Sequence, residues 1–375
     1  MPKTEIGHRY ILDGHKLNFH MDRVEAWERG GLIPPVTMDI ALTTRCNAQC
    51  HFCAAAYQTG VQSVLPTDAA LRLVEDAAEI GVRGMVLMSD GESTLHTAWE
   101  DVIEHGKNLG MDMAAASNGF LITSERAERV LPHLTYLRIN FSAGEVDRYS
   151  QIMGVPRFWF KKVIGNIRYM VEFKRKHKLA VTINMNMVLH PRDADQVLPF
   201  ARLGKELGVD YAIIKHCLDY SNAPLAVDYS EYDKIIPFIR EAEALSTPDY
   251  LVAVKWRMIK AGGEPSCERC YGPQFLLQAS GTGLLAACGP MFAPRYAAKY
   301  HIGNIRDTRL KDLWRSPRYR EVMSYLQSDD FVATRDCRNY LCVQRHLNEA
   351  LSRHLSGEER LSVPTGSAPE HINYI

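Results

Sequence analysis

Three closely spaced cysteines are the residues of this sequence whose type and spacing point most directly to chemistry. Cys46, Cys50 and Cys53 have a C-x3-C-x2-C spacing and follow a strand-like segment. Cysteine thiolates are the usual protein ligands of iron–sulfur clusters, and a [4Fe–4S] cube normally takes four of them. Three thiolates would leave one iron open to a substrate or a cofactor. The spacing therefore predicts a cluster with one open coordination position.

Two simpler interpretations of these cysteines stay open at this point. Positions i, i+4 and i+7 can share one face of a helix, where cysteine packs as a small hydrophobic residue. A structural zinc site is the other alternative, but zinc needs a fourth ligand. The neighbouring His51 does not continue the C-x2-C spacing.

A second group of cysteines lies in the last third of the chain. Eight of the nine cysteines fall within residues 46–53 or 267–342, which favours two metal sites. The second group consists of Cys267, Cys270, Cys288, Cys337 and Cys342. A zinc ribbon would use the C-x2-C pair at 267 and 270, but the last two cysteines are spaced C-x4-C, which is unusual for zinc.

The first motif, including the aromatic Phe52 before its last cysteine, resembles the radical S-adenosylmethionine (radical SAM) superfamily. The resemblance implies that Cys46, Cys50 and Cys53 hold a [4Fe–4S] cluster whose open iron chelates the amino and carboxylate groups of SAM. In that family the reduced cluster cleaves SAM to methionine and a 5′-deoxyadenosyl radical. A flavodoxin or ferredoxin is the implied reductant.

The second group resembles the SPASM or twitch extension of the same superfamily, in which a β-hairpin positions cysteines around an auxiliary cluster. The matching features are Gly283-x4-Cys288 with an upstream cysteine, then Gly303-Asn304, then a Leu-x-x-Leu-Trp run at 310–314. Five cysteines are too few for two auxiliary clusters. We therefore expect one auxiliary [4Fe–4S] cluster, with Cys267 either spare or replacing Cys270. The expected ligands are Cys270, Cys288, Cys337 and Cys342.

The overall composition limits the classes of protein to consider. The 375 residues carry 44 Lys and Arg and 44 Asp and Glu, so no charge excess suggests nucleic acid or a membrane surface as partner. No apolar run has the length of a membrane span, and the N-terminus lacks a signal-peptide pattern. Nine cysteines in such a chain indicate a reducing compartment. We expect a cytoplasmic protein.

Strand and helix patterns alternate between residues 36 and 220, which predicts parallel βαβ units. Six such units predict an α/β fold, a partial (β/α)6 barrel like the radical SAM core. In α/β barrels, chemistry occurs at the C-terminal ends of the strands. The expected strands are 36–42, 84–88, 111–116, 136–141, 179–188 and 211–214. The expected helices are 67–79, with Thr67 or Asp68 as its N-cap, 97–109, 124–131, 160–177 and 194–207.

Polar residues follow the second and third expected strands. The run Asp90-Gly91-Glu92 resembles the family's Gly-Gly-Glu-Pro motif, so Gly91 and Glu92 are expected at the SAM amino group, although such a run also forms plain turns. Ser117 and Asn118 precede Gly119, similar to a Thr-Asn-Gly sequence in relatives, so the resemblance implies that both, like Phe52, contact SAM. A simple Asn-Gly turn explains them equally well.

The fourth and fifth strands also carry polar side chains. Ser142 is located where relatives contact the SAM ribose or carboxylate. Asn184 and Asn186 interrupt an otherwise apolar strand, and buried amides need hydrogen-bond partners. Those partners could be a ligand, water or neighbouring backbone. Asn184 is assigned to cofactor binding.

Cys217 is the one cysteine outside both groups. It ends the sixth strand beside Lys215 and His216, where its thiol could give a hydrogen atom to a substrate radical. The alternative is an inert buried cysteine. Lys215 and His216 could bind an anionic or hydroxylated substrate, or form a cap or an ion pair.

The remaining segments complete the expected organisation. Residues 10–20 and 24–27 resemble leaders of radical SAM proteins from sugar, lipopolysaccharide and antibiotic pathways, which favours a carbohydrate, aminocyclitol or nucleoside substrate. The tail from residue 356 is expected to be mobile or draped. The expected segments are 1–35 N-terminal extension, 36–220 radical SAM core, 221–262 helical bridge, 263–350 SPASM/twitch domain and 351–375 tail.

The sequence thus predicts a radical SAM enzyme that abstracts hydrogen from a C–H bond of a hydroxylated small molecule. The favoured outcome is epimerisation with Cys217 as hydrogen-atom donor, and dehydrogenation with the auxiliary cluster as electron acceptor is the alternative. A peptide-modifying SPASM maturase and a zinc-stabilised binding protein are the other hypotheses. Partners are a sugar-like substrate and the reductant, without nucleic acid or membrane.

Overall fold

The computed structural model describes residues 9–57, 60–88, 90–219, 225–261, 267–337, 342–365 and 368–375. The chain forms two compact units, each assembled from separated stretches. The first unit comprises Met1–Asp13, Cys46–Ala54 and Ala114–Gly263, and the second comprises Gly14–Arg45, Ala55–Met113 and Glu264–Ile375. Strand β3 (Asp112–Ser117) passes from the second unit into the first.

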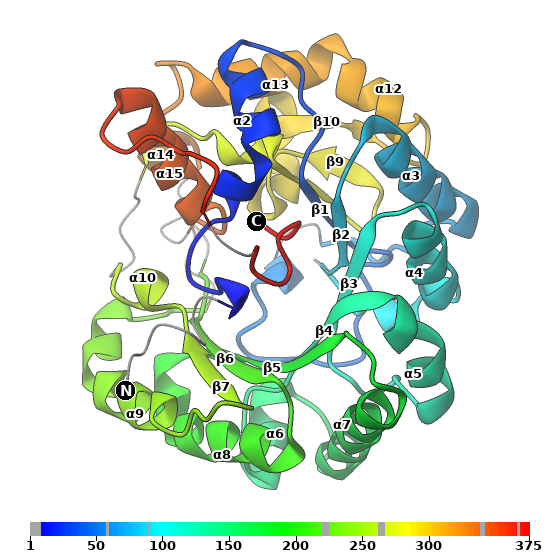
Figure 1. Ribbon diagram of the computed structural model, residues 1–375, viewed down its shortest axis with the longest axis vertical. Helices are drawn as coiled ribbons and strands as arrows, with labels where there is room; N and C mark the ends of the chain where they lie inside the picture. Colours follow the sequence, from blue (N-terminus) through cyan, green and yellow to red (C-terminus); the bar gives the residue numbers. More distant parts are fainter. Residues whose placement is uncertain are drawn as a thin grey trace. The chain divides into compact units, whose positions relative to one another are not determined.

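The first unit contains a parallel sheet with the order β4-β5-β6-β7. Helices cover one face of this sheet (Figure 1). On that face Ile139 of β4 and Val163 of α7 lie so near Gly119 that a side chain there would meet both. Because alternate strand residues point to opposite faces, Arg138, Asn184 and Asn186 point away from the helices. The strands are β4 (Leu134–Asn140), β5 (Thr182–Leu189), β6 (Tyr211–His216) and β7 (Leu251–Val254). The helices are α5 (Ser124–Val130), α6 (Val146–Met153), α7 (Phe158–His177), α8 (Val197–Leu207), α9 (Tyr232–Glu243) and α10 (Trp256–Ile259), with 3-10 turns at Leu131–His133, Pro191–Gln196 and Tyr229–Glu231.

The second unit has the strand order β10-β9-β8-β1-β2. Strands β1, β2 and β8 run parallel, whereas β8, β9 and β10 form antiparallel pairs. The turn between β8 and β9 contains Gly283 at φ 86°, a left-handed conformation that glycine adopts without strain. The predicted hairpin is therefore confirmed. The strands are β1 (Thr37–Ile40), β2 (Gly84–Leu87), β8 (Leu276–Ala279), β9 (Leu284–Ala286) and β10 (His301–Asn304).

Helix α3 packs against α4 and α12 in the second unit. The structure places Pro66 at the N-cap of α3 with no side-chain cap, so the expected cap by Thr67 or Asp68 is wrong. The helices are α2 (Met21–Glu28), α3 (Thr67–Ile80), α4 (Trp99–Asn108), α11 (Ala297–Tyr300), α12 (Leu310–Arg315), α13 (Pro317–Gln327), α14 (Ala333–Asp336) and α15 (Arg345–Ser356). The 3-10 turns are Leu17–His20, Ser93–Leu95, Gly272–Gln274, Gly289–Phe292 and Pro294–Tyr296, and Ala54–Tyr57 at the passage between the units.

All six expected strands are present, and two further strands extend their sheets. β7 pairs with β6, and β8 pairs with β1, both in parallel. The described part of the segment 221–262, expected as a helical bridge, contains the helices α9 and α10 and also the four-residue strand β7, which follows α9. Helix α6 was also not expected.

The end of the chain is held in place within the second unit. The buried ammonium of Lys16 donates to the carbonyl oxygens of His371 and Tyr374 at 2.8 and 2.9 Å. Thr37, the first residue of β1, donates to the carbonyl of Asn373 at 2.7 Å. The tail was expected to be either mobile or draped over the protein. Residues 368–375 are draped, because these hydrogen bonds hold them against the rest of the second unit.

Candidate functional site

The first cysteine motif forms an irregular loop in the first unit, so the helix-face interpretation of these cysteines is wrong. The loop pairs with the end of α6, where Gln49 and His51 donate backbone N–H groups to Met153 and Ile152 at 3.2 and 3.1 Å. Gly154 ends α6 at φ 61°, and a Cβ there would lie 2.2 Å from the carbonyl oxygen of Gln49. Only glycine lets the loop approach so closely.

Asn118 ties the loop to the end of β3. Its Nδ2 donates to Oδ1 of Asn47 at 2.7 Å, and its own Oδ1 accepts from the backbone of Phe120 at 3.0 Å. Ser117 accepts from the backbone of Gly119 at 2.9 Å. Asn118 therefore forms the expected turn and also holds the residue next to Cys46.

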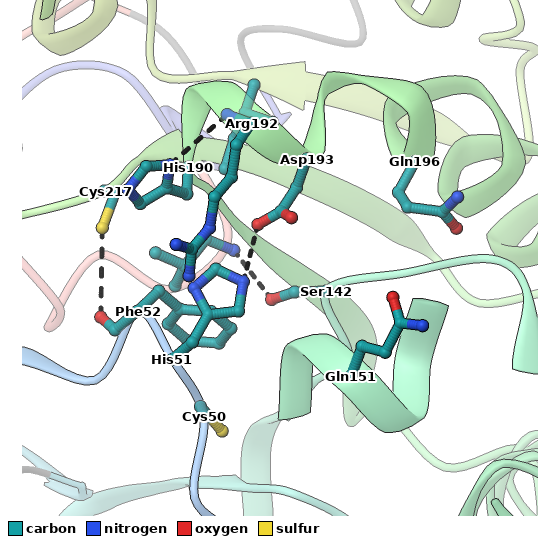
Figure 2. Close-up of polar contacts among 12 residues, drawn as sticks. Cys50, His51, Phe52, Ser142, Gln151, His190, Arg192, Asp193, Gln196 and Cys217 are labelled. Atoms are coloured by element: carbon teal, nitrogen blue, oxygen red, sulfur yellow. Dashed lines mark hydrogen bonds and ion pairs between the residues drawn. The ribbon is translucent and has the colours of Figure 1, made fainter. Parts of the chain in front are cut away.

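A buried carboxylate fixes the middle of the loop. His51 lies between the second and third cysteines, and its Nε2 is 2.9 Å from Oδ2 of Asp193 (Figure 2). Asp193 is 2% exposed and also binds Arg148 of α6 at 3.1 Å. Asp193 was not predicted from the sequence, because it lies in a 3-10 turn after β5, far from the motif in sequence.

Cys217 lies directly beside the same loop. It is fully buried, and its Sγ is 3.9 Å from the carbonyl oxygen of Phe52 (Figure 2). Its backbone N–H is bound by Leu189 and by the hydroxyl of Tyr232. Burial, together with the nearby Asp219, raises the pKa of the Cys217 thiol to about 12. The group therefore remains an S–H group at neutral pH.

The polar residues of β4 and β5 have different surroundings. Ser142 accepts from the backbone N–H of Val188 at 3.1 Å, and Asn186 donates to Asn140 at 3.0 Å. Asn184 is fully buried, donates to Leu137 at 3.4 Å, and has no partner for its Oδ1 among the described residues. Of these side chains, Asn184 therefore has a buried amide oxygen that can still accept a hydrogen bond from a ligand. Its cofactor role, like that of Ser142, stays a prediction.

The Asp90-Gly91-Glu92 run belongs to the second unit; Ser89, just before it, lies outside the described residues. A Cβ on Gly91 would lie 2.1 Å from the carbonyl oxygen of Thr43, so a glycine is required there. Asp90 accepts from Ser280 and from the backbone of Gly281 at 2.6 and 3.1 Å, which anchors the β8–β9 turn. The buried Glu92 accepts from the backbone and hydroxyl of Thr94 at 3.2 and 2.6 Å.

The second cysteine group gathers in the second unit. Burial and the neighbouring Cys267 and Cys337 raise the pKa of Cys270, and burial with Cys337 and Cys270 raises that of Cys288. A hydrogen bond with Cys267 lowers the pKa of Cys342, but burial and the other thiols raise it overall. All five cysteines are therefore neighbours, including the expected spare, Cys267.

Asn348 of α15 organises this group and was missed by the sequence analysis. It is fully buried, and its Oδ1 accepts from the backbone N–H groups of Tyr271 and Gly272 at 2.7 and 2.8 Å. These two bonds orient the amide, so its Nδ2 is directed at the sulfurs of Cys270 and Cys342, 3.6 and 3.7 Å away. N–H donors of this kind orient and tune thiolate ligands.

The two groups of cysteines are suitable ligands for iron–sulfur clusters. Buried thiols with raised pKa values ionise readily only beside a strong positive charge, which a cluster supplies. In the first loop the backbone N–H of Ala48 already points at Sγ of Cys46, 3.5 Å away. In the described part of the chain, no group of three or more His, Cys, Asp or Glu is arranged to hold a single metal ion. In a cube, by contrast, each thiolate binds a different iron.

Fold and site together define an α/β enzyme built around cysteine-ligated clusters, and two family models give the class. Residues 40–203 match the Radical SAM superfamily, and residues 267–342 match SPASM, an iron–sulfur cluster-binding domain. Residues 40–203 are therefore a radical SAM domain, and residues 267–342 are a SPASM domain. These domains imply a [4Fe–4S] cluster, SAM and a further iron–sulfur centre, as predicted.

Several known proteins are similar to this chain. A probable GTP 3′,8-cyclase of Saccharolobus solfataricus is 27% identical over 178 residues, which are 47% of this chain and 55% of that protein. The chain thus spans about half the length of this relative. An AdoMet-dependent heme synthase of Methanosarcina barkeri is 23% identical over 300 residues, 73% of this chain and 80% of that protein.

Solved structures confirm the fold class. Streptococcus suis SuiB bound to S-adenosylmethionine aligns with 82% of this chain and 72% of its own, at TM-score 0.62 and 15% identity. Native anSMEcpe with bound AdoMet aligns with 90% of this chain and 93% of its own, at TM-score 0.57 and 17% identity. The expected partial barrel with a C-terminal SPASM region is therefore the fold of this chain. In the described residues, no helix has both the length and the apolar character needed to cross a membrane.

Proposed function

We propose that this radical SAM enzyme epimerises a carbon of a hydroxylated small molecule, and that Cys217 donates the returning hydrogen atom. The observation that carries the proposal is the position of the Cys217 thiol, buried and 3.9 Å from the Phe52 carbonyl of the cysteine loop. When bound, SAM and its cluster supply a 5′-deoxyadenosyl radical that removes a substrate hydrogen.

Residues of this chain account for the remaining steps. The loop contacts of Asn118 and Asp193 hold the SAM-binding cysteines in place. Cys217 transfers its hydrogen atom to the substrate radical from the face opposite to abstraction, which forms a C–H bond and leaves a thiyl radical. One electron from the external reductant and one proton then restore the thiol.

The test uses anaerobically reconstituted enzyme in deuterated buffer with a panel of sugars, aminocyclitols and nucleosides. One compound should be inverted at one carbon and gain one deuterium there, because a thiol proton exchanges with solvent. Cys217→Ala should still form 5′-deoxyadenosine but no inverted product. Inversion by Cys217→Ala, or a product without deuterium, would refute the proposal.

Dehydrogenation is the second candidate, supported by a buried carboxylate on β1. Asp39 is 8% exposed and accepts from Gln278 at 3.0 Å. Gln278 in turn accepts from the backbone of Gly289, the residue after Cys288. A carboxylate here could accept the hydroxyl proton while the auxiliary cluster accepts an electron. An unlabelled ketone with one 5′-deoxyadenosine per turnover would favour this reaction.

Peptide modification remains the third candidate, supported by solved structures. SuiB has been crystallised with its precursor peptide SuiA, and anSMEcpe with a Cp18Cys peptide. A synthetic peptide panel in the same assay tests this substrate class directly.

A further inference from the structure

The face of the first-unit sheet that points away from the helices carries an unusual pair of lysines. The parallel ladder pairs Val254 with Ile214, and the next ladder bond runs from Lys255 N to Ile214 O at 3.0 Å. Lys255 is therefore directly opposite Lys215, and both side chains point to the same face of the sheet. Like charges in directly opposite positions repel each other.

The two lysines differ in how their charge is compensated. Lys255 donates to the carbonyl oxygen of Leu12 and interacts with the carboxylate of Asp13. Among the described residues, the ammonium of Lys215 has no hydrogen bond or ion pair, although its backbone pairs with Val188 of β5. Its charged neighbours there are Lys255 and Arg138, beside the Cys217 thiol. Lys215 therefore lies between two other cations, Lys255 and Arg138, and has no ion pair of its own in the part of the chain that the structure describes.

Two further observations indicate that this region binds a ligand. Burial, with Arg138 and Lys255 adding to it, lowers the pKa of Lys215 to about 7, as expected for a cation that lacks a counter-ion. Asn184, which pairs in register with Arg138 of β4 on the same face, keeps a fully buried Oδ1 without a partner in the described chain. A ligand that hydrogen-bonds the half-buried Lys215 ammonium and the buried Asn184 amide would complete the interactions of both groups.

We propose that Lys215, supported by Lys255 and Arg138, binds an anionic group of the substrate, a carboxylate or a phosphate. Cys217 directly follows β6 and continues its ladder through the bond from its N–H to Leu189, so Lys215 and Cys217 point to the same face with Cα atoms about 6.5 Å apart. An anion held by Lys215 therefore brings the carbons next to it within reach of the thiol. This inference names the substrate class of the proposed reaction and rests on that proposal.

Calorimetric titration of the anaerobically reconstituted holoenzyme tests the inference. The probes are inorganic phosphate and D-glucuronate, with D-glucose as the neutral control. The wild type should bind both anions but not glucose, and Lys215→Met should bind them at least tenfold more weakly. Lys215→Arg should retain most of the affinity because it keeps the charge. Lys205→Met, which changes an exposed lysine of α8 in the same unit, should bind like the wild type.

SAM has a carboxylate of its own, so its affinity is measured on the same variants. An unchanged SAM affinity in Lys215→Met supports a substrate site, whereas a tenfold loss for SAM with unchanged anion binding overturns it. Equal anion binding by wild type and Lys215→Met, or no anion binding by the wild type, also overturns it. Cys217→Ala should bind the anions normally, so failure of the epimerase proposal can be distinguished from failure of this one.

Discussion

Cys217 should react with alkylating agents far more slowly than an ordinary cysteine, because only the thiolate reacts. The pKa of the Cys217 thiol is raised from 9.0 to about 12, chiefly by burial. At pH 8 a thiol with the ordinary pKa is about 10% ionised, whereas a pKa of about 12 leaves about 0.01% ionised. The thiolate fraction therefore falls by a factor of about 1,000, before any steric protection.

The assay is iodoacetamide labelling of the holoenzyme at pH 8, followed by mass spectrometry of the peptide that contains residue 217. Glutathione in the same tube gives the reference rate, and unfolded protein gives complete labelling. Cys217→Ala identifies the peptide unambiguously. Labelling within tenfold of the glutathione rate would mean that about 1% or more of the group is thiolate at pH 8, and would refute a Cys217 pKa raised by burial to about 12.

Three further predictions follow from the site. Glu92→Gln should weaken SAM binding by the value of a charge-assisted hydrogen bond, about 1.5–3 kcal/mol, without loss of iron, since an amide oxygen can still accept from Thr94; unchanged affinity in equilibrium dialysis would limit Glu92 to capping the turn. Asn348→Leu removes the N–H···S contacts to Cys270 and Cys342, so the midpoint potential of the auxiliary cluster should become more negative. The cluster should also be lost roughly 10- to 100-fold more readily. An unchanged midpoint potential in an EPR-monitored redox titration contradicts this prediction. The pKa of Lys215 is lowered from 10.5 to about 7 in the folded chain, so the unfolded chain holds the extra proton between these values and the unfolding free energy should rise with pH from 7 to 10.5. Lys215→Met should reduce that rise and stabilise the apoprotein by at most about 4 kcal/mol at pH 7, as measured by denaturant unfolding; the pKa of Lys255, lowered to about 8, accounts for the rise that remains.

The local chemistry and the repeating elements could be predicted from the sequence. Cys46, Cys50 and Cys53 lie within one loop, so neighbouring residues encode the whole motif and its chemistry can be predicted from the sequence. The six strands were predictable because each carries an apolar run bounded by turns. Two features of the fold that were not predicted correctly also concern short segments of the chain. β7 is four residues long after an amphipathic helix, and Thr67 follows a proline that takes the N-cap position.

Tertiary structure alone decided which distant residues meet. Asp193 reaches His51, and Asn348 reaches Cys270, across 142 and 78 residues of chain. Lys215 and Lys255 become opposite neighbours only through the register of β6 and β7. Register is set by which face of each strand is buried, and a shift of one residue would turn every side chain to the other face. The sequence by itself therefore determined the kind of chemistry, while packing determined which side chains surround it.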